Sequence, residues 1–456
     1  MISIKQLLAD GNTIPQVIDE LRKKEIELPN WDDLKKEYDP KLHPVMDLGL
    51  YPDKPGKKGV VKVTRTTRGL QRRAVKIMTG MMFGIPVGRI YQFNGAEEER
   101  AAKLLENIIT ANRIDTVNIN RSIKLFAACE AATLWYAIKE PNNIYGEQSP
   151  LKLKCRIFSP MGKDRLFPLF DEYGDMVAFS LEYTRTENKK TVTYFDTYTA
   201  TEHYKWRNLN GEWEEVESDD IAEIGKIPIG YITRETPVWE DSNNITEIEW
   251  AYSRNGNYLR RNSVPVFEIK EDNKIDFGKE NDDDERVILQ LSSNGSASYQ
   301  TWPQAIESLK FHTEGLERAF FSDIQLPNLS FEEMKSSAQS GESKRYMFME
   351  AQIKVLEEQG AWLELLSREI SVIKSFAKIM FPGLAGAFDA VQVTNVITPF
   401  SMTDEKDTVN NVTNAVAGKI ASRKTGVERL GWVRDVDKEL EEIDGDEMND
   451  LTEPTF

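Results

Sequence analysis

Few residues in this sequence have the types and spacing needed for chemistry. The three histidines, His43, His203 and His312, lie far apart and have no cysteine or carboxylate at zinc-ligand spacing. Each is therefore expected to be a surface or satisfied polar side chain. The sequence contains neither G-x-x-x-x-G-K-[ST], which cradles nucleotide phosphates, nor G-x-S-x-G, which presents a nucleophilic serine. We expect a protein that is not an enzyme and that carries no cofactor.

Two weaker patterns also favour structure over chemistry. Gly80, Gly84 and Gly88 do not have the spacing of a dinucleotide-binding loop, and a turn after a helix explains them better. Asp272, Asp276 and Gly278 faintly suggest a calcium loop, but Lys274 occupies a position that needs an oxygen ligand. We expect no metal site.

The net charge distinguishes a protein that binds nucleic acid tightly from one along which nucleic acid moves. The formal net charge of -17 disfavours a conventional nucleic-acid binder, because phosphate contacts normally supply most of the affinity. The same charge does not exclude a protein that DNA slides past without being bound tightly. The acidic run Asp282, Asp283, Asp284 and Glu285 is either a solvated loop or a patch that faces DNA or a partner.

One segment has the opposite charge. Nine basic residues and no acidic residue lie between Lys54 and Lys76. This segregation indicates either a contact with another subunit or a larger assembly, or a solvated helix face.

The elements that would position these residues begin with a helical first third. Pro15 follows Thr13 at an expected helix start, and Leu70, Ala74, Ile77 and Met81 recur at helical intervals. Further helices are predicted from Glu97 to Arg113 and from Asn118 to Lys139. Cys129 would then lie in a helix and Cys155 in a strand, both as buried free thiols typical of a reducing cytoplasm.

The pattern changes to strands between residues 150 and 235. Leu151, Leu153, Cys155 and Ile157 alternate, and Asn210-Gly211 between two tryptophans marks a hairpin. This region is predicted to be an antiparallel sheet.

The rest of the chain is predicted to be helical with a small β insertion. One helix covers 241 to 262, strand-like runs follow, and a second helix begins at Trp302-Pro303. A polar loop, Gln325 to Ser340, leads into a helix of about 60 Å from Gly341 to Met380, with Gly360 as an expected bend. A strand from Val391 to Ile397 and short helices complete a mainly helical α+β fold. No stretch reaches membrane-spanning length.

Several short motifs occur in the order found in portal, or head-to-tail connector, proteins of tailed double-stranded-DNA bacteriophages. Met82-Phe83-Gly84-Ile85-Pro86 resembles a turn in that family, and Gly225-Lys226-Ile227-Pro228 resembles its step before a long helix. Ser340-Gly341-Glu342-Ser343-Lys344 resembles the start of the family's longest helix, with Ser343 in place of a small apolar residue. The chain thus resembles a siphophage-type portal protein from about Leu70 to Ile443.

The resemblance implies a ring of about twelve subunits built from named regions. These are a wing at 1–240, stem helices at 241–262 and 303–324, a clip at 263–302, a tunnel loop at 325–340, a long wing helix and returning strand at 341–403, and a crown at 404–456. The implied partners are duplex DNA in the channel, terminase, a head-tail adaptor, and the capsid and scaffolding proteins. The implied location is the portal vertex of the virion, reached by assembly in the host cytoplasm.

Three groups of site residues follow from that assignment. The DNA-facing candidates in the tunnel loop are Glu332, Glu333, Lys335, Ser336, Ser337 and Gln339. The clip candidates for docking partners are Asp282, Asp283, Asp284 and Glu285. The residues expected to bury in stem helix pairing are Tyr252, Leu259, Leu309, Leu316 and Phe320. Two alternatives remain: another phage structural subunit, such as a capsid or adaptor protein, and a nucleic-acid enzyme.

Overall fold

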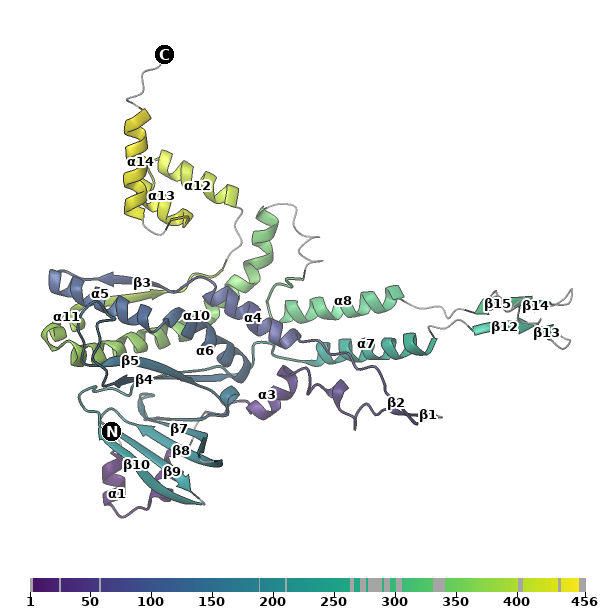
Figure 1. Cartoon of the computed structure of the whole chain (residues 1–456), viewed down its shortest axis with the longest axis horizontal. Helices are drawn as coiled ribbons and strands as arrows, with labels where there is room; N and C mark the ends of the chain where they lie inside the picture. Colours follow the sequence, from purple (N-terminus) through teal and green to yellow (C-terminus); the bar gives the residue numbers. More distant parts are fainter. Residues whose placement is uncertain are drawn as a thin grey trace.

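The computed structural model shows a layered body, a projecting pair of helices and a separate group of C-terminal helices (Figure 1). The structure describes residues 3–23, 26–56, 59–187, 189–209, 211–262, 266–270, 276–277, 289–290, 296–300, 306–330, 341–400, 405–433 and 436–450. Both the mixed composition and the order of elements agree with the predicted α+β class. None of the helices in these ranges is long and apolar enough to cross a membrane.

A five-stranded antiparallel sheet lies at one side of the body, with the strand order β10-β9-β8-β7-β6. Its strands are β6 (Arg165–Phe170), β7 (Met176–Glu187), β8 (Lys190–Tyr198), β9 (Glu202–Leu209) and β10 (Glu212–Asp220). Gly174 and Gly211 have φ values of 83° and 96° in the turns β6–β7 and β9–β10, a conformation that glycine adopts without strain. The predicted hairpin at Gly211 is confirmed.

Two N-terminal helices cover this sheet. They are α1 (Ile4–Ala9) and α2 (Ile14–Leu21). Ile4, Val17 and Ile18 are buried against Phe195 and Trp206 of the sheet. The apolar stripe of the first helices therefore supplies a small core of its own.

A second antiparallel sheet, ordered β11-β4-β5, corrects one prediction. Its strands are β4 (Glu130–Ile138), β5 (Lys152–Phe158) and β11 (Ile229–Thr233). The helix predicted from Asn118 to Lys139 was wrong in its second half, because the chain turns at Cys129 with φ 61° and continues as β4. Since β4 is buried on both faces over its first six residues, it lacks the alternation that identifies a strand.

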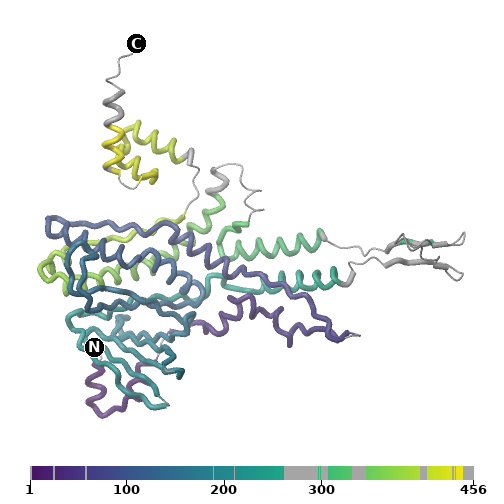
Figure 2. The backbone as a smooth tube through the Cα atoms, in the orientation of Figure 1, coloured from purple at the N-terminus to yellow at the C-terminus, as the bar shows by residue number. Residues whose placement is uncertain are grey.

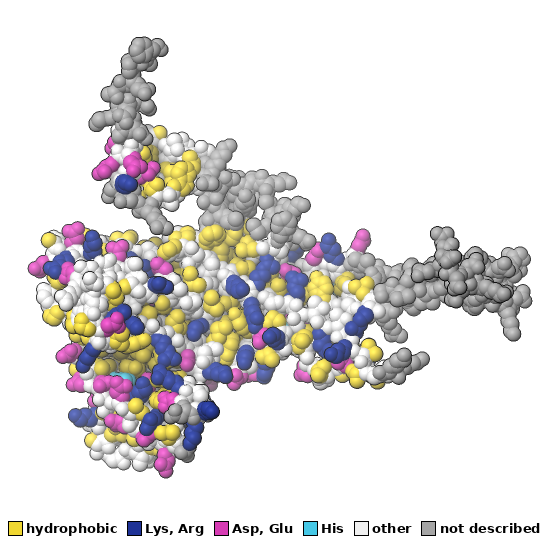
Figure 3. Space-filling model, in the orientation of Figure 1, with side chains coloured by type: hydrophobic (Ala, Val, Ile, Leu, Met, Phe, Trp, Pro, Cys, Tyr) yellow, Lys and Arg dark blue, Asp and Glu magenta, His cyan; other side chains and the backbone are white. Residues whose placement is uncertain are grey.

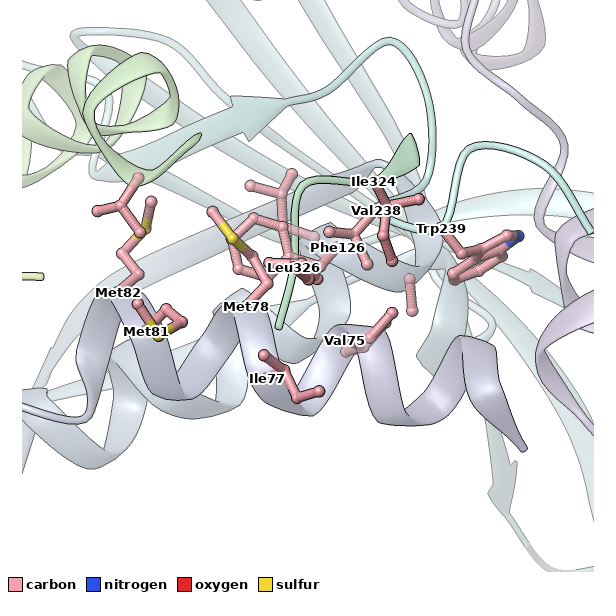
Figure 4. Close-up of a cluster of buried hydrophobic side chains, with 14 of the residues drawn as sticks. Val75, Ile77, Met78, Met81, Met82, Phe126, Val238, Trp239, Ile324 and Leu326 are labelled. Atoms are coloured by element: carbon pink, nitrogen blue, oxygen red, sulfur yellow. The ribbon is translucent and has the colours of Figure 1, made fainter. Parts of the chain in front are cut away.

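Helices fill the layer above this sheet. They are α4 (Leu70–Phe83), α5 (Ala96–Ala111), α6 (Ile114–Ala128), α10 (Gly341–Met380) and α11 (Ala385–Ala390), with α3 (Trp31–Tyr38) beside them. Figure 4 shows Val75 and Met78 of α4 beside Phe126 and Leu326, within the largest buried cluster. Residues of α3, α4, α6 and α10 meet in this cluster, so segments far apart in the sequence share one core.

The longest helix, α10, has the predicted bounds. Its first turns rise from the layer, and the remainder runs within it (Figure 1). The predicted bend at Gly360 stays a prediction. After α11 the chain returns as β16 (Gln392–Val396), which pairs antiparallel with β3 (Gly88–Gln92).

The remaining elements form the projection and the C-terminal group. The projecting helices are α7 (Asn243–Asn262) and α8 (Ile306–Asp323), and between them in sequence lie β12 (Val266–Lys270), β13 (Asp276–Phe277), β14 (Leu289–Gln290) and β15 (Ser296–Gln300). β12 pairs with β15 and β13 with β14. A short ribbon of β1 (Lys54–Gly56) and β2 (Gly59–Val61) lies beside α7 (Figure 1). The last helices are α12 (Glu405–Ala417), α13 (Arg423–Leu430) and α14 (Val436–Asp450), which stand apart from the body along the backbone trace of Figure 2.

Candidate functional site: the helical hairpin and its root

The hairpin of α7 and α8 is packed most firmly at its root, where it leaves the body. Ile245 and Ile248 of α7 are fully buried there, and Phe320 and Phe321 of α8 are each 2% exposed. All four belong to the same core cluster as α4 and α10. Burial of this apolar surface, at about 25 cal/mol per Å², attaches the hairpin to the body.

The five side chains predicted to be buried between these helices differ in how deeply they are buried along the hairpin. Phe320 is buried, Tyr252 and Leu316 are partly buried against the core cluster, and Leu309 is half-buried. Leu259 is 43% exposed in the single chain, so its burial in stem packing stays a prediction. It lies near the far end of α7, where the pairing of two helices in one chain leaves a side open to solvent.

The described part of the basic segment from Lys54 to Lys76 runs along α7 to the hairpin root. It passes from Thr64 beside Asn257 to Arg68 beside Glu249. Arg68 forms an ion pair of 2.8 Å with Glu317 of α8, and Arg73 approaches the same carboxylate at 3.8 Å. Arg65 pairs with Asp53 and Arg72 with Asp39, each at 2.8 Å. These four arginines thus make contacts inside the subunit, which neither sequence-based interpretation anticipated. Their partners were hidden from the sequence because Arg68 and Glu317 are 249 residues apart.

A buried polar cluster joins α7 to the chain before it. His43 is 2% exposed, and its ring nitrogens lie 2.7 Å from a Glu249 carboxylate oxygen and 2.6 Å from the Glu37 carbonyl oxygen. The Glu249 carboxylate also accepts a hydrogen bond of 2.6 Å from the Arg68 backbone N–H. Both ring nitrogens thus have a polar partner. His43 is therefore a satisfied buried polar residue, as predicted.

Lys354 of α10 contacts the two segments at the hairpin root, one just before α7 and one just after α8. Its ammonium donates to the Ile324 carbonyl oxygen at 2.7 Å, just past the end of α8, and to Glu240 at 3.3 Å, just before α7. The side chain is 5% exposed, and this burial lowers the pKa of Lys354 below its usual value. A cation at the end of α8 also suits the negative end of the helix dipole.

A second buried ion pair anchors α10 in the body. Arg121 of α6 and Glu369 of α10 lie 2.6 Å apart and are 1% and 3% exposed. The Trp135 indole N–H donates to Glu369 at 3.2 Å, and Arg121 donates to Asn118 at 2.6 Å. Sequence reasoning missed this pair, and no local spacing could have found it.

The groups considered for chemistry do not assemble into a reactive site in the described ranges. No set of three or more His, Cys, Asp or Glu side chains there could hold a metal ion. Burial raises the pKa of both Cys129 and Cys155 to about 12, which keeps these thiols protonated near neutral pH. Asp276 lies in β13, whereas Asp272, Lys274 and Gly278 of the faint calcium pattern fall outside the described residues.

Two of the three predicted groups of site residues fall outside the part of the chain that the structure describes. The tunnel-loop candidates there are Glu332, Glu333, Lys335, Ser336, Ser337 and Gln339. The clip candidates there are Asp282, Asp283, Asp284 and Glu285. Their roles remain predictions.

The hairpin and its polar root define the class of fold: an α+β chain with a firmly rooted helical projection. A sequence model described as "Phage portal protein, SPP1 Gp6-like" matches residues 20–450. The chain belongs to this family of phage portal proteins. The resemblance seen in the sequence is thereby confirmed, and the family is a structural one.

Chains in solved structures resemble this chain only distantly. A chain of the "Virion of native gene transfer agent (GTA) particle" is 11% identical, with a TM-score of 0.37, over 93% of this chain and 97% of that one. A chain of the "Neck of empty GTA particle computed with C6 symmetry" is also 11% identical, with a TM-score of 0.37, over 81% of this chain and 88% of that one. No curated protein matches the sequence.

Proposed function

We propose that this chain is the ring subunit that forms the DNA channel at one vertex of a phage capsid. The observation that carries the proposal is its membership of the portal family over residues 20–450. In this role the ring admits the genome during packaging, retains it, and releases it on ejection. It makes and breaks no covalent bond.

The regions of the subunit would divide this work. Helices α7 and α8 fit the stem, the strands between them the clip, and residues 325–340 the tunnel loop. Residues 1–240 with 341–403 would form the wing, and 404–456 the crown. The Arg68–Glu317 ion pair and the hydrogen bond from Lys354 to the Ile324 carbonyl oxygen support this division, because they would hold stem and wing at a fixed angle.

The passage of DNA calls for weak contacts. B-DNA carries one negative charge per about 1.7 Å of its axis, so a channel lined by many fixed cations would hold it by counterion release. A chain of net charge -17 can line the channel without such deep wells. In the tunnel loop, Lys335 would make transient phosphate contacts, and Glu332 and Glu333 would repel the backbone.

This part of the proposal is tested by substituting Lys335. We expect phages with Lys335→Ala or Lys335→Glu to package DNA more slowly or to a shorter length, with the larger defect for the glutamate. Packaging at the normal rate and length in both variants would remove Lys335 from the mechanism.

The clip would recruit partners in sequence. Asp282, Asp283, Asp284 and Glu285 would dock first the terminase and then the head-tail adaptor, which need basic surfaces to match four carboxylates. Contacts of the wing with capsid and scaffolding proteins would place the ring at the vertex.

The ring itself is tested by the mass of the purified full chain. Mass photometry should find a particle of about twelve times the 52.2 kDa subunit. A stable monomer at micromolar concentration would contradict the proposal.

A further inference from the structure

The first half of α10 exposes a row of apolar side chains. Tyr346, Met349, Ile353 and Leu356 are 71%, 53%, 43% and 55% exposed. We call these four residues the α10 seam. On the other side of the same helix, Phe348, Ala351 and Val355 are buried in the body. The seam is therefore additional to the face that α10 needs for folding.

The spacing of the seam indicates what covers it. Its residues are separated by three, four and three positions, which is the repeat that keeps an apolar row facing a partner helix. Large apolar side chains exposed together on a surface mark interaction sites. A helical partner surface is thus expected.

Charges beside the seam exclude the simplest partner, a second α10. Glu350 and Glu357 directly follow Met349 and Leu356, and neither forms an ion pair with any residue in the described ranges. In an antiparallel pair of α10 helices these carboxylates would face each other and repel. The partner surface should be apolar and basic.

The C-terminal helices carry such a surface. Ile420 and Trp432, at the two ends of α13, are 86% and 64% exposed. Lys419 directly precedes Ile420, and Arg429 lies three residues before Trp432. Both basic side chains are exposed and have no ion-pair partner in the described part of the chain. We call these four residues the α13 surface. Hydrophobic side chains gather on this C-terminal group in Figure 3.

The arrangement of the subunit brings the two surfaces to the same side of the body. The first turns of α10 rise toward the side on which α12, α13 and α14 stand, whereas the five-stranded sheet lies on the opposite side (Figure 1). Because the α10 seam and the α13 surface are different surfaces of one chain, their contact between copies is heterologous. Contacts of this kind generate rings when the rotation closes.

We propose that the α13 surface of one subunit docks on the α10 seam of a second copy. In this contact Ile420 and Trp432 cover the apolar row, while Lys419 and Arg429 approach Glu350 and Glu357. The inference rests on the proposed ring and adds a specific contact to it. It links the C-terminal helices of each subunit to the helix that follows the 325–340 loop in the next.

The test uses two full-length chains, each with one new cysteine. One carries Met349→Cys and the other Trp432→Cys with a distinguishing tag, and the two are mixed, assembled and oxidised. Both positions are exposed, so the substitutions should leave the fold intact. The native thiols of Cys129 and Cys155 should not interfere, because burial raises their pKa to about 12. We expect a disulfide-linked pair that contains one chain of each kind.

A matched control replaces Met349→Cys by Glu172→Cys. Glu172 is exposed in the turn between β6 and β7, outside the α10 seam, and should give no linked pair with Trp432→Cys. Glu357→Lys should lower the yield of the Met349–Trp432 link at least several-fold, and Arg429→Glu in the partner chain should restore it.

The outcomes separate this inference from the proposed function. Rings that form without the mixed disulfide overturn the docking contact and leave the ring standing. A third chain that carries both Met349→Cys and Trp432→Cys tests for a contact within one subunit, and a link that forms only within that chain also overturns the inference. Failure of the wild-type chain to form a ring contradicts the proposed function itself.

Discussion

Single residues decide how α10 is held in the body. Arg121 and Glu369 form a fully buried ion pair, and the loss of one partner leaves the other charge without compensation. The pair is also hydrogen-bonded to Trp135 and Asn118, so its geometry is fixed from both sides. The register of α10 against α6 and β4 therefore depends on two side chains.

We expect Glu369→Gln to lower the free energy of unfolding by about 3–5 kcal/mol, because the Arg121 cation stays buried beside a neutral amide. A lower thermal midpoint in scanning calorimetry would show this. The double variant Arg121→Met, Glu369→Leu should recover much of the loss, since it buries no charge. A Glu369→Gln chain as stable as the natural one would show that the pair does not hold α10.

The two thiols give a prediction that depends on pH. Burial raises the pKa of Cys129 and Cys155 to about 12, so the reactive thiolate is scarce in the folded protein until the pH approaches that value. Unfolding restores an ordinary pKa of about 8.5 and hence a much larger thiolate fraction at pH 8. Labelling by iodoacetamide at pH 8 should therefore be slow when folded and fast in denaturant. Equal rates in both states would contradict the burial of Cys129 and the partial burial of Cys155.

At the scale of elements, the hairpin depends on contacts between distant segments. Glu317 of α8 receives Arg68 and Arg73 at once, and Lys354 spans the ends of both helices. These polar contacts add direction to the apolar packing of the root. These contacts therefore fix the angle between the hairpin and the body.

Glu317→Gln should loosen the root of the hairpin. It removes the charge on which two arginines converge, and we expect a loss of about 1–3 kcal/mol in the local stability of α8. Faster amide exchange in α8, measured by mass spectrometry, would report it. Glu314→Gln is the matched control, because Glu314 lies on the same helix, is 40% exposed and pairs only with Lys310 in the described structure at 3.6 Å. Equal exchange in both variants would count against a polar lock.

Much of the element order could be predicted from the sequence. The bounds of α10 and the hairpin turn at Gly211 follow from local patterns, that is, an uninterrupted helical period and a turn residue between strands. The boundary at Cys129 could not be predicted, because small apolar residues continue through it without a glycine or proline. β3 and the short β1 and β2 were missed as well, since edge ribbons of three to five residues carry little signal.

The candidate site divides in the same way. The hairpin helices and their apolar residues near the root are visible as periodic patterns, whereas the partners of Arg68, Arg121 and His43 depend on the tertiary fold. Leu259 is 43% exposed in the single chain, because helical spacing indicates a face but not how far along that face a partner within the same chain extends. The residues of the α10 seam recur in the sequence at intervals of three and four. They were not recognised as a separate surface, because the buried face of the same long helix has a similar apolar periodicity.

At the scale of the whole molecule, membership of the portal family and the net charge of -17 both fit the proposed role of a subunit in a DNA channel. An acidic ring can surround duplex DNA without binding it tightly, as a channel requires. The hairpin, locked at its root, would keep its orientation while DNA moves past.

The most direct test is a cryo-electron microscopy map of the assembled full-length chain, viewed along the symmetry axis. We predict a closed ring around a hole wide enough for duplex DNA, about 20 Å across, with α7 and α8 beside it and residues 325–340 of every subunit facing the hole. A particle without a central opening, or one in which residues 325–340 lie on its outer surface, would contradict the account.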